Sequence, residues 1–430
     1  MQRLQAFKFE LMPSGEQQRS MRRFVGSCRV VFNEALRLQQ TRYTNAEKKL
    51  GYAQLCKQLT DWRSGRAMPS GRVATWLKDA PIHPLQQTLK HLERGYVNFF
   101  EGRASFPQPK KKGRGDSFRY PDAKQFEIDQ ANSRLKLPKL GWMRYRNSRE
   151  ILGTAKNITV SQSGGKWFAS IQTEREVEKP VPVAITAIGI DVGIARFATM
   201  SDGSFVAPLS SFKKHENRLA KYQRRMSRKV KFSKNWHKAK RKVQQIHSTI
   251  SNTRKDFLHK TTAAISKNHA LVAVEDLQVR NMSKSAVGTV EKAGKNVAQK
   301  SGLNKAILDQ GWFEFRRQLD YKLEWKGGIL VAVPPQYTSQ TCPCCDHVAK
   351  ENRQTQAKFE CVDCGYENNA DVVGAINILA RGHRVLACGE DVRRAKVARP
   401  KRANSKKQEP TEATLVSSNA DESAVGIPSL

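Results

Sequence analysis

The sequence lacks any long hydrophobic run, and this excludes the simplest routes to a membrane. No stretch of about 18 apolar residues is present, the length that a membrane-spanning helix requires. Residues 1–5 do not open the apolar stretch of a secretory signal peptide. No basic amphipathic helix stands alone as a membrane anchor. We therefore expect a cytoplasmic protein with no membrane partner.

Negative charge is also scarce. The 430 residues include 76 Lys and Arg but only 39 Asp and Glu, which gives a formal net charge of +37 at pH 7. A surface this one-sided attracts polyanions, and nucleic acid is the favoured partner. The imbalance is greatest in residues 211–260, where 17 Lys and Arg accompany only Glu216 and Asp256. A solvated helical face is the alternative, but such faces usually mix charges of both signs.

Two basic segments are candidates for contact with phosphate. One lies within residues 211–260, and the other is a linker at 107–115 that is rich in Pro, Lys and Gly. Tyr222 and Trp236 could stack on bases or pack, and packing is favoured for Trp236. The candidate phosphate contacts are Arg224, Arg225, Arg228, Lys229 and Lys231 in the first segment, with Lys110, Lys111 and Lys112 in the second.

Cysteine is used sparingly, and half of the eight cysteines form one motif. Two Cys-x-x-Cys pairs are separated by 15 residues, a spacing that fits tetrahedral Zn²⁺. Four protein ligands leave no position for water, so the zinc should be structural. Cys344 leaves a small ambiguity of register, Cys28 is expected in a helix core, and Cys388 has no nearby partner. The expected ligands are Cys342, Cys345, Cys361 and Cys364.

Three acidic residues stand in distinctive settings. Asp191 ends the apolar run 187–190, Glu275 ends the apolar run 271–274, and Asp371 follows the second cysteine pair. Each has an ordinary explanation: a turn residue for Asp191, a helix N-cap for Asp371, and competition from Asp276 for the role of Glu275. Carboxylates at the ends of buried strands are costly unless they are paired or bound to metal. Three that converge would form a divalent-metal site, whose carboxylates should have raised pKa values without the metal.

The hydrophobic pattern predicts a mainly helical segment near the start of the chain. A strand is expected over residues 6–11, and Ser14 with Gln17 can form a capping box that begins a helix. Further helices are expected near 52–62, near 72–79 and from Pro84 onward.

Beyond the linker the pattern turns to strands until about residue 175, and it becomes α/β from 185. Residues 390–430 contain no aromatic residue and are expected to be disordered. Within the α/β part, strands are expected within 188–200 and at 271–274 and 329–333, helices at 211–260, 303–326 and 371–381, and a mobile loop at 281–302.

The three acidic segments together resemble the motifs of RuvC-type nucleases with the RNase H fold. Residues 189–194 look like the first motif, 274–277 like the second, and Asp371 with 374–379 like the third. A zinc ribbon between the second and third motifs, opening at residues 338–342, is similar to the TnpB family. That family consists of transposon-encoded RNA-guided DNA endonucleases related to type V CRISPR effectors.

The resemblance implies an α/β fold with an RNase H-like (RuvC) core, an inserted zinc ribbon and an N-terminal β-barrel-like module carrying a helical insertion. The usual third motif has Asn and Ala where Val373 and Gly374 stand here, which puts the packing of the last helix in doubt. The implied division is a β wedge-type module at 1–12 and 116–182, a helical recognition domain at 13–115, a nuclease domain at 183–335 and 366–389, a zinc ribbon at 336–365 and a tail at 390–430.

The resemblance also implies a function. Asp191, Glu275 and Asp371 would hold two Mg²⁺ ions and cut double-stranded target DNA beside a short adjacent motif. The partner would be a guide RNA derived from the transposon end, bound to a monomeric, nucleoid-associated protein. The alternatives are a transposase that joins strands, a guided or unguided DNA-binding repressor that has lost cleavage, and a zinc-ribbon RNA-binding protein. The three acids count against the last two.

Overall fold

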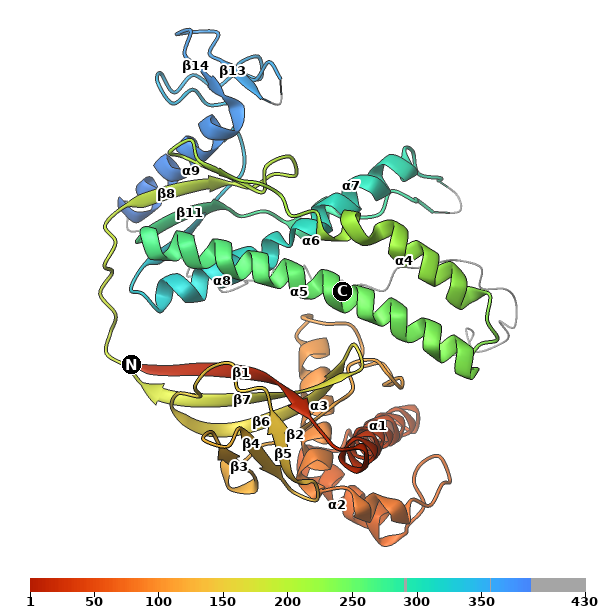
Figure 1. Cartoon of the computed structure of the whole chain (residues 1–430). Coiled ribbons are helices and arrows are strands. Elements are labelled where there is room, and N and C mark those ends of the chain that lie inside the picture. The colour runs from red at the N-terminus through yellow and green to blue at the C-terminus, as the bar shows by residue number, and fades with distance from the viewer. Residues whose placement is uncertain (290–291, 356, 388–430) are drawn as a thin grey trace.

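The structure, a computed structural model, describes residues 1–289, 292–355 and 357–387, and it consists of two halves (Figure 1). The N-terminal half is built on a seven-stranded sheet, and the C-terminal half on a five-stranded sheet. The tail predicted to be disordered, residues 390–430, lies outside the described residues. Among the helices of the described ranges, none combines the length and apolar character needed to cross a membrane.

The N-terminal sheet is antiparallel and has the order β2-β6-β7-β1-β5-β4-β3. β1 (Gln2–Met12) lies between β7 (Lys166–Glu176) and β5 (Gly141–Tyr145), so the first strand pairs with strands far along the chain. The helical segment between them is therefore an insertion into the sequence of this sheet. The remaining strands are β2 (Ser117–Tyr120), β3 (Glu127–Asp129), β4 (Arg134–Leu137) and β6 (Thr154–Ser163), with a 3₁₀ turn η2 (Ala123–Gln125).

Helices of the insertion pack on one face of that sheet. α1 (Gly15–Thr44) begins at the predicted capping box, in which the Ser14 hydroxyl accepts from the Gln17 N–H at 3.2 Å and the Gln17 side chain accepts from the Ser14 N–H at 2.9 Å. Cys28 is buried in the shared core, as predicted. The others are α2 (Tyr52–Ser64), a 3₁₀ turn η1 (Thr75–Asp79) in place of the helix predicted at 72–79, and α3 (Ile82–Phe100).

The C-terminal sheet has the order β10-β9-β8-β11-β12. β11 is parallel to both of its neighbours, whereas β9 runs antiparallel to β8. Because helices cover both faces, its central strands are continuous apolar runs, as parallel strands buried on both sides require. The strands are β8 (Ala187–Asp191), β9 (Ala198–Met200), β10 (Phe205–Val206), β11 (Leu271–Glu275) and β12 (Ile329–Val333).

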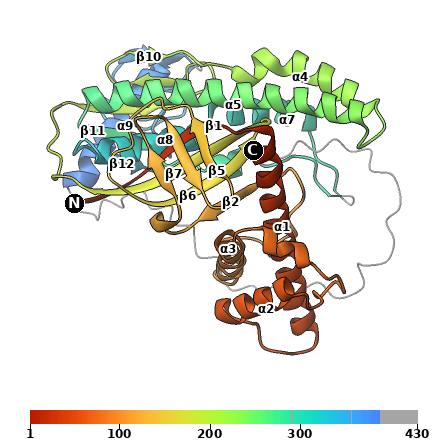
Figure 2. The same cartoon turned by 60° about the horizontal axis from the view of Figure 1, so that its bottom comes forward.

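α5 (Lys234–Asn268) and α8 (Trp312–Glu324) cover one face of this sheet, and α9 (Ala370–Ala387) covers the other. The approach of α9 is very close at Gly189, where an added Cβ would lie 2.1 Å from the Ala375 carbonyl oxygen. Figure 2 shows α5 running across the seven-stranded sheet of the other half. The halves touch where the Arg3 guanidinium donates to the Trp325 carbonyl at 3.1 Å.

Three predicted elements differ in the structure. The single helix expected at 211–260 is an antiparallel hairpin of α4 (Ser211–Ser227) and α5, joined by a turn at 228–233. The helix expected at 303–326 is broken at Gly311, whose φ of +75° ends α7 (Val297–Gln310) and precedes α8. α7 also begins within the loop predicted at 281–302, which holds the end of the short helix α6 (Val279–Met282) as well.

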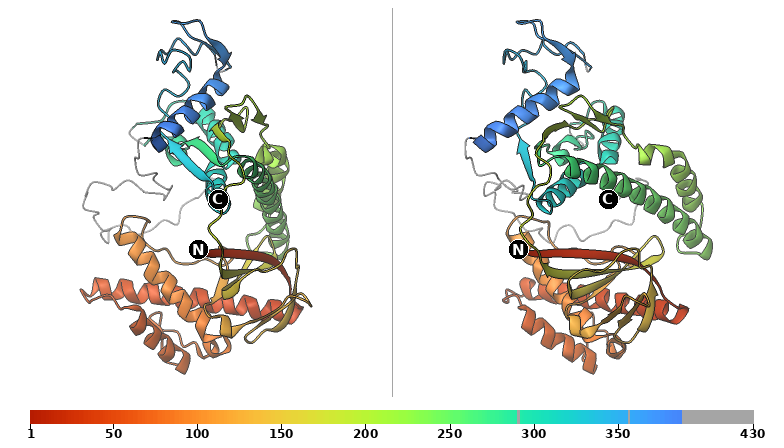
Figure 3. Two further views of the ribbon diagram at one scale, coloured as in Figure 1. Left: turned by 90° about the vertical axis from the view of Figure 1, so that its left-hand side faces the viewer. Right: turned by 60° about the vertical axis from the view of Figure 1, so that its left-hand side comes forward.

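A small two-stranded ribbon of β13 (Lys358–Glu360) and β14 (Glu367–Asn369) precedes α9. Its core contains Cys342, Phe359 and Cys361 together with Ala370 and Val373 of α9. Both views of Figure 3 place this ribbon at the end of the molecule farthest from the N-terminal half. The ribbon is therefore anchored on the helix that carries the third acidic residue.

Candidate active site

The first two acidic residues of the expected triad lie at one edge of the C-terminal sheet. Asp191 is the last residue of β8, and Glu275 is the last residue of β11. The two strands are parallel neighbours with Ile190 opposite Val274, so both carboxylates emerge at the same end. The carboxyl ends of adjacent parallel strands are a recurrent place for ligand sites in α/β folds.

The third acidic residue belongs to α9, the helix on the face of the sheet that α5 and α8 do not cover. Asp371 lies in the first turn of α9, and three residues further on Gly374 lies directly against Asp191. A Cβ at Gly374 would be 3.1 Å from the Asp191 Oδ2 atom, a contact tighter than most side chains tolerate. Val373 is fully buried in the ribbon core. The two departures from the usual third motif therefore have local roles: Gly374 gives Asp191 room, and Val373 fastens α9 to the ribbon.

The electrostatics show that Asp191 lies near both of the other carboxylates. Burial, together with the negative charges of Glu275 and Asp371, raises the pKa of Asp191 to about 7. Burial also raises the pKa of Glu275, although the hydrogen bond from Thr338 opposes this. The oxygens do not all come within 4.8 Å of one another, since the cysteine quartet is the only such set within the described ranges.

A cation that sequence reasoning missed lies among these acids. The Arg353 guanidinium is 3.7 Å from the Asp371 carboxylate, and its charge lowers the pKa values of both Asp191 and Glu275. Arg353 belongs to the zinc ribbon, in the segment between the two cysteine pairs. No pattern in the sequence distinguishes it from the other cations of this basic chain, because its position depends on how the ribbon packs against α9.

A hydrogen-bonded chain holds Glu275 in place. The Thr338 hydroxyl donates to Glu275 Oε1 at 2.7 Å. The buried Asn377 amide of α9 donates to the carbonyl oxygens of Thr338 at 2.8 Å and Thr341 at 2.7 Å. Arg381, one turn further along α9, donates to the carbonyls of Pro334 and Gln336. The segment that leads from β12 into the ribbon is thus fixed on α9 and in turn orients Glu275.

Asp276, the competitor for the role of Glu275, has a different partner. It forms an ion pair with Arg316 of α8 and is about half exposed. Consecutive residues at the end of a strand point to opposite faces, so only one of the two acids can face Asp191. Glu275, and not Asp276, is the acid of this pair whose charge raises the pKa of Asp191.

The four predicted zinc ligands come together. Their Sγ atoms all lie within 4.8 Å of one another, and the pairs Cys342–Cys364 and Cys345–Cys361 are 3.6 Å apart. Four thiolates about 2.3 Å from a tetrahedral zinc ion lie roughly 3.8 Å apart, so the quartet fits Zn²⁺. Cys344 is exposed and outside the quartet, which resolves the ambiguity of register. Cys388 lies outside the described residues.

The predicted phosphate contacts divide into two groups. Those of the first segment are all exposed, at the end of α4 and in the turn before α5. Lys110 is only partly exposed, because its ammonium lies 4.5 Å from the centre of the Phe32 ring and its backbone bonds to Asn33. Lys111 and Lys112 are exposed. Tyr222 packs against the core of the α4–α5 hairpin.

Comparison with known families gives matches to three segments of the chain. Residues 170–286 match a family described as "Probable transposase", and residues 1–49 match its "Helix-turn-helix domain". Residues 312–378, which include the cysteine quartet, match a family described as "Cas12f1-like, TNB domain". These segments include all three acids, the strands β8 and β11, and the first part of α9.

Two relatives align over nearly their full lengths. The chain is 56% identical over 412 residues to "Putative RNA-guided DNA endonuclease InsQ" of Escherichia coli strain K12, which covers 96% of this chain and 98% of the relative. It is 33% identical to "Putative RNA-guided DNA endonuclease" of Streptomyces pristinaespiralis, with 95% and 97% covered. A solved Cas12f1–sgRNA–target DNA complex aligns with 88% of this chain and 99% of that chain, at 14% identity and a TM-score of 0.32, too slight a likeness to support an argument.

Replacing Asp191 by Asn should stabilise the metal-free protein in a pH-dependent way. The pKa of Asp191 is raised from 3.8 to about 7, so the charged carboxylate lowers the free energy of unfolding increasingly as pH rises from 4 to 7. Each pH unit between the two pKa values corresponds to ~1.4 kcal/mol, so we expect a gain of about 2–4 kcal/mol above pH 7 and a smaller one at pH 5. Thermal unfolding in EDTA measures it, with Asp276→Asn as the control. A gain that is equal at both pH values would contradict the account.

Proposed function

The chain belongs to the TnpB family of RNA-guided DNA endonucleases, and we propose that it cuts DNA with a metal site built from Asp191, Glu275 and Asp371. The enzyme hydrolyses phosphodiester bonds of DNA under the direction of an RNA, the activity for which its relatives are named. The observation that supports the site assignment is the convergence of Glu275 and Asp371, from distant segments, on Asp191, whose pKa is raised to about 7 by burial and by these two charges.

The core of this enzyme is an RNase H-like (RuvC) fold in our proposal. The mixed five-stranded sheet, its single antiparallel internal strand β9 and the helices on both faces support that assignment. The position of Asp191 and Glu275 at the ends of adjacent parallel strands supports it further. The N-terminal sheet and its helical insertion would form the wedge-type and recognition modules, with the ribbon at 336–365 inserted into the nuclease.

The acids fit a hard divalent cation. They offer carboxylate oxygens, the ligands that Mg²⁺ prefers, in a place where uncompensated negative charge is costly. Asp191, which feels the charges of both other acids, would hold two Mg²⁺ ions together with Glu275 and Asp371. Bound Mg²⁺ supplies a Lewis acid that activates water and neutralises charge on the transferred phosphate.

Protein groups around the acids can orient the carboxylates and bind a phosphodiester. Arg353 brings a guanidinium beside Asp371, where it can hold a phosphate oxygen of the DNA strand by charge-assisted hydrogen bonds. Thr338 fixes the orientation of Glu275, and Asn377 fixes Thr338. Preorganised groups of this kind lower the barrier because they need little reorganisation during the reaction.

The partners in this proposal are a guide RNA derived from the transposon end and a double-stranded target. The guide pairs with one DNA strand, and the protein recognises a short motif beside the target. The exposed cations of the α4–α5 hairpin, with Lys111 and Lys112 of the linker, would contact phosphates, while Lys110 would act mainly through packing. The complex would contain one protein chain and associate with the nucleoid.

Two other functions remain distinguishable from this one. A DNA-binding repressor without cleavage has no use for three converging acids, and their retention opposes it. A transposase that joins strands could use the same fold and acids. Demonstration of joined DNA strands by the purified protein would favour the transposase over the endonuclease.

Asp191→Ala should abolish cleavage of guide-matched plasmid DNA while binding of the RNA persists. The substitution removes the carboxylate that both proposed metal positions share, and we expect cleavage to fall by at least about a thousandfold, a loss on the scale of ~4 kcal/mol. Asp276→Asn is the matched control, since Asp276 pairs with Arg316 outside the site. Full cleavage by Asp191→Ala would reject the site assignment.

Thr338→Val should lower the cleavage rate without unfolding the ribbon. It preserves side-chain shape but leaves Glu275 Oε1 without its 2.7 Å donor, and a hydrogen bond to a charged group contributes ~1.5–3 kcal/mol. We expect kcat to fall roughly tenfold or more and the Mg²⁺ requirement to rise. Thr338→Ser, which keeps the hydroxyl, should restore both. Equal activity of the Val and Ser variants would show that Thr338 acts only in packing.

A further inference from the structure

The turn that joins α4 to α5 holds an aromatic residue in an unfavourable conformation. Phe232 has a φ of +69°, in the left-handed region that bulky side chains seldom adopt. Its side chain is 69% exposed. Backbone strain of this kind persists only where the surrounding structure enforces it, and it is enriched at functional sites.

Packing within the hairpin does not account for this aromatic residue. The apolar core between α4 and α5 consists of Leu219, Val243, Ile246 and Ile250, and Phe232 is not part of it. Phe232 instead lies against the half-exposed Trp236, with ring centres 5.4 Å apart. The end of the hairpin therefore presents two adjacent aromatic rings to solvent.

Positive charge surrounds these rings. The Lys231 ammonium is 5.6 Å from the centre of the Phe232 ring, and the Lys240 ammonium is 4.9 Å from that of Trp236. The two acids of the hairpin are engaged elsewhere, Glu216 with Lys305 and Asp256 with Lys260. Within the part of the chain that the structure describes, Lys231 and Lys240 therefore have no carboxylate partner from the hairpin.

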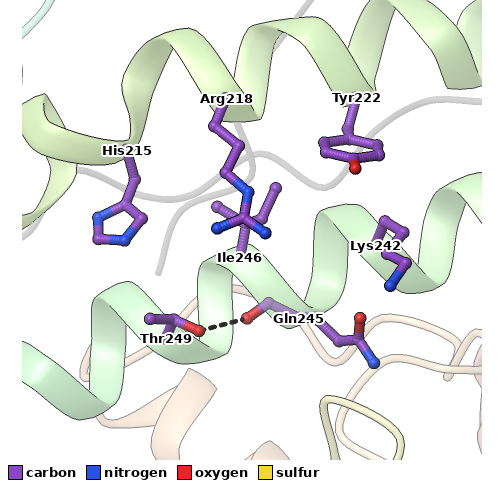
Figure 4. Close-up of a pocket in the computed structure, with 7 residues that line it drawn as sticks. All are labelled: His215, Arg218, Tyr222, Lys242, Gln245, Ile246 and Thr249. Carbon is purple, nitrogen blue, oxygen red and sulfur yellow. Dashed lines mark hydrogen bonds between the residues drawn. The ribbon is translucent and has the colours of Figure 1, made fainter.

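A polar pocket lies between the two helices behind this end (Figure 4). It has a volume of about 200 Å³, and no carboxylate lines it. Figure 4 shows Arg218 and Tyr222 projecting from α4 toward α5, Arg218 over Ile246 and Tyr222 on the side of Lys242. Lys242 follows the first residue of α5 by eight positions, which places the pocket about 12 Å from the aromatic end, at ~1.5 Å per residue.

The base of the hairpin is fixed, so these features are held in a defined place. The buried Asp309 carboxylate of α7 accepts from the Phe212 N–H at the start of α4, at 2.8 Å, and from the Arg254 guanidinium of α5, also at 2.8 Å. One side chain thus fastens both helices to the nuclease half. Figure 1 shows the hairpin running out from that base to one side of the five-stranded sheet.

We propose that the end of the α4–α5 hairpin binds an unpaired segment of the guide RNA, with a base stacked on Phe232 and Trp236 and a backbone phosphate in the pocket at Arg218 and Lys242. The inference deepens the proposed function and rests on it for the identity of the RNA. Aromatic rings that alternate with cations bind single strands because every base has a face that can stack. A separation of about 12 Å corresponds to roughly two nucleotides of extended single strand.

RNA fits this surface better than target DNA does. RNA recognition relies on single-stranded loops and ends, whose unstacked bases lie on aromatic side chains. Bases of the target strand are paired with the guide, so they have no free face to offer. The displaced DNA strand is the other source of unpaired bases, and the experiment below separates it from the RNA.

Phe232→Asn tests the proposal, because Asn tolerates the left-handed conformation but cannot stack as a ring does. The probe is the RNA that co-purifies with the wild-type protein, transcribed and labelled. We expect its dissociation constant to rise roughly five- to hundredfold, the range measured for loss of a base–aromatic stack. The melting temperature of the protein should stay equal or rise, since the backbone strain is relieved. A role in packing predicts the opposite, a lower melting temperature.

Phe313→Asn is the matched control, since Phe313 is an exposed aromatic residue of α8, away from the hairpin end. An equal loss of RNA affinity in that variant would overturn the proposal. A second result would also overturn it: Phe232→Asn binds the RNA as tightly as the wild type does but binds a single-stranded DNA of the same sequence more weakly. That result would assign the surface to the displaced DNA strand. Plasmid cleavage by the wild type at saturating RNA separates a failure of the proposed nuclease function from a failure of this inference. If the wild type binds RNA but never cuts, the nuclease assignment fails while this inference stands.

Discussion

The repulsion that the partly buried Asp191 carboxylate experiences from Glu275 and Asp371 is the constraint on which the rest of the structure depends. Asp191 and Glu275 end adjacent parallel strands, and α9 brings Asp371 to them across the opposite face of the sheet. Like charges in a partly buried place are costly, so the fold must supply strong compensating packing. It does so where α9 lies on Gly189 and where Gly374 makes room for Asp191. A divalent cation bound among the acids would relieve their repulsion, and the free energy gained would contribute to the affinity for the cation.

The zinc ribbon participates in the site and is not an appendage beside it. Thr338 leads into the ribbon and donates to Glu275, Arg353 extends from the ribbon to Asp371, and Val373 of α9 is buried in the ribbon core. Loss of the four thiolate ligands would therefore disturb the positions of the acids as well as the local fold. A zinc ion held by the cysteine quartet would in this way help to fix the geometry of the metal site that we propose at the three acids.

Much of the site could be predicted from the sequence, because its signals are local. An apolar run that ends in an acid marks a buried strand, and two Cys-x-x-Cys pairs mark a zinc site. What failed depended on tertiary structure. The hairpin break at 228–233 and the break at Gly311 lie within polar or helix-compatible stretches, and turns stabilised by packing leave little trace there. Arg353 could not be predicted for a similar reason. It is one of many cations in the sequence, and only the packing of the ribbon against α9 brings it beside Asp371.

The location of bound Mn²⁺ in crystals of the RNA-bound protein, found by anomalous scattering, tests the central claim most directly. Mn²⁺ substitutes for Mg²⁺ at oxygen sites and can be distinguished from zinc by its absorption edge. The account predicts Mn²⁺ ligated by Asp191 together with Glu275 and Asp371, and zinc at the cysteine quartet. Mn²⁺ found elsewhere, with these three carboxylates pointing away from a common centre, would contradict it.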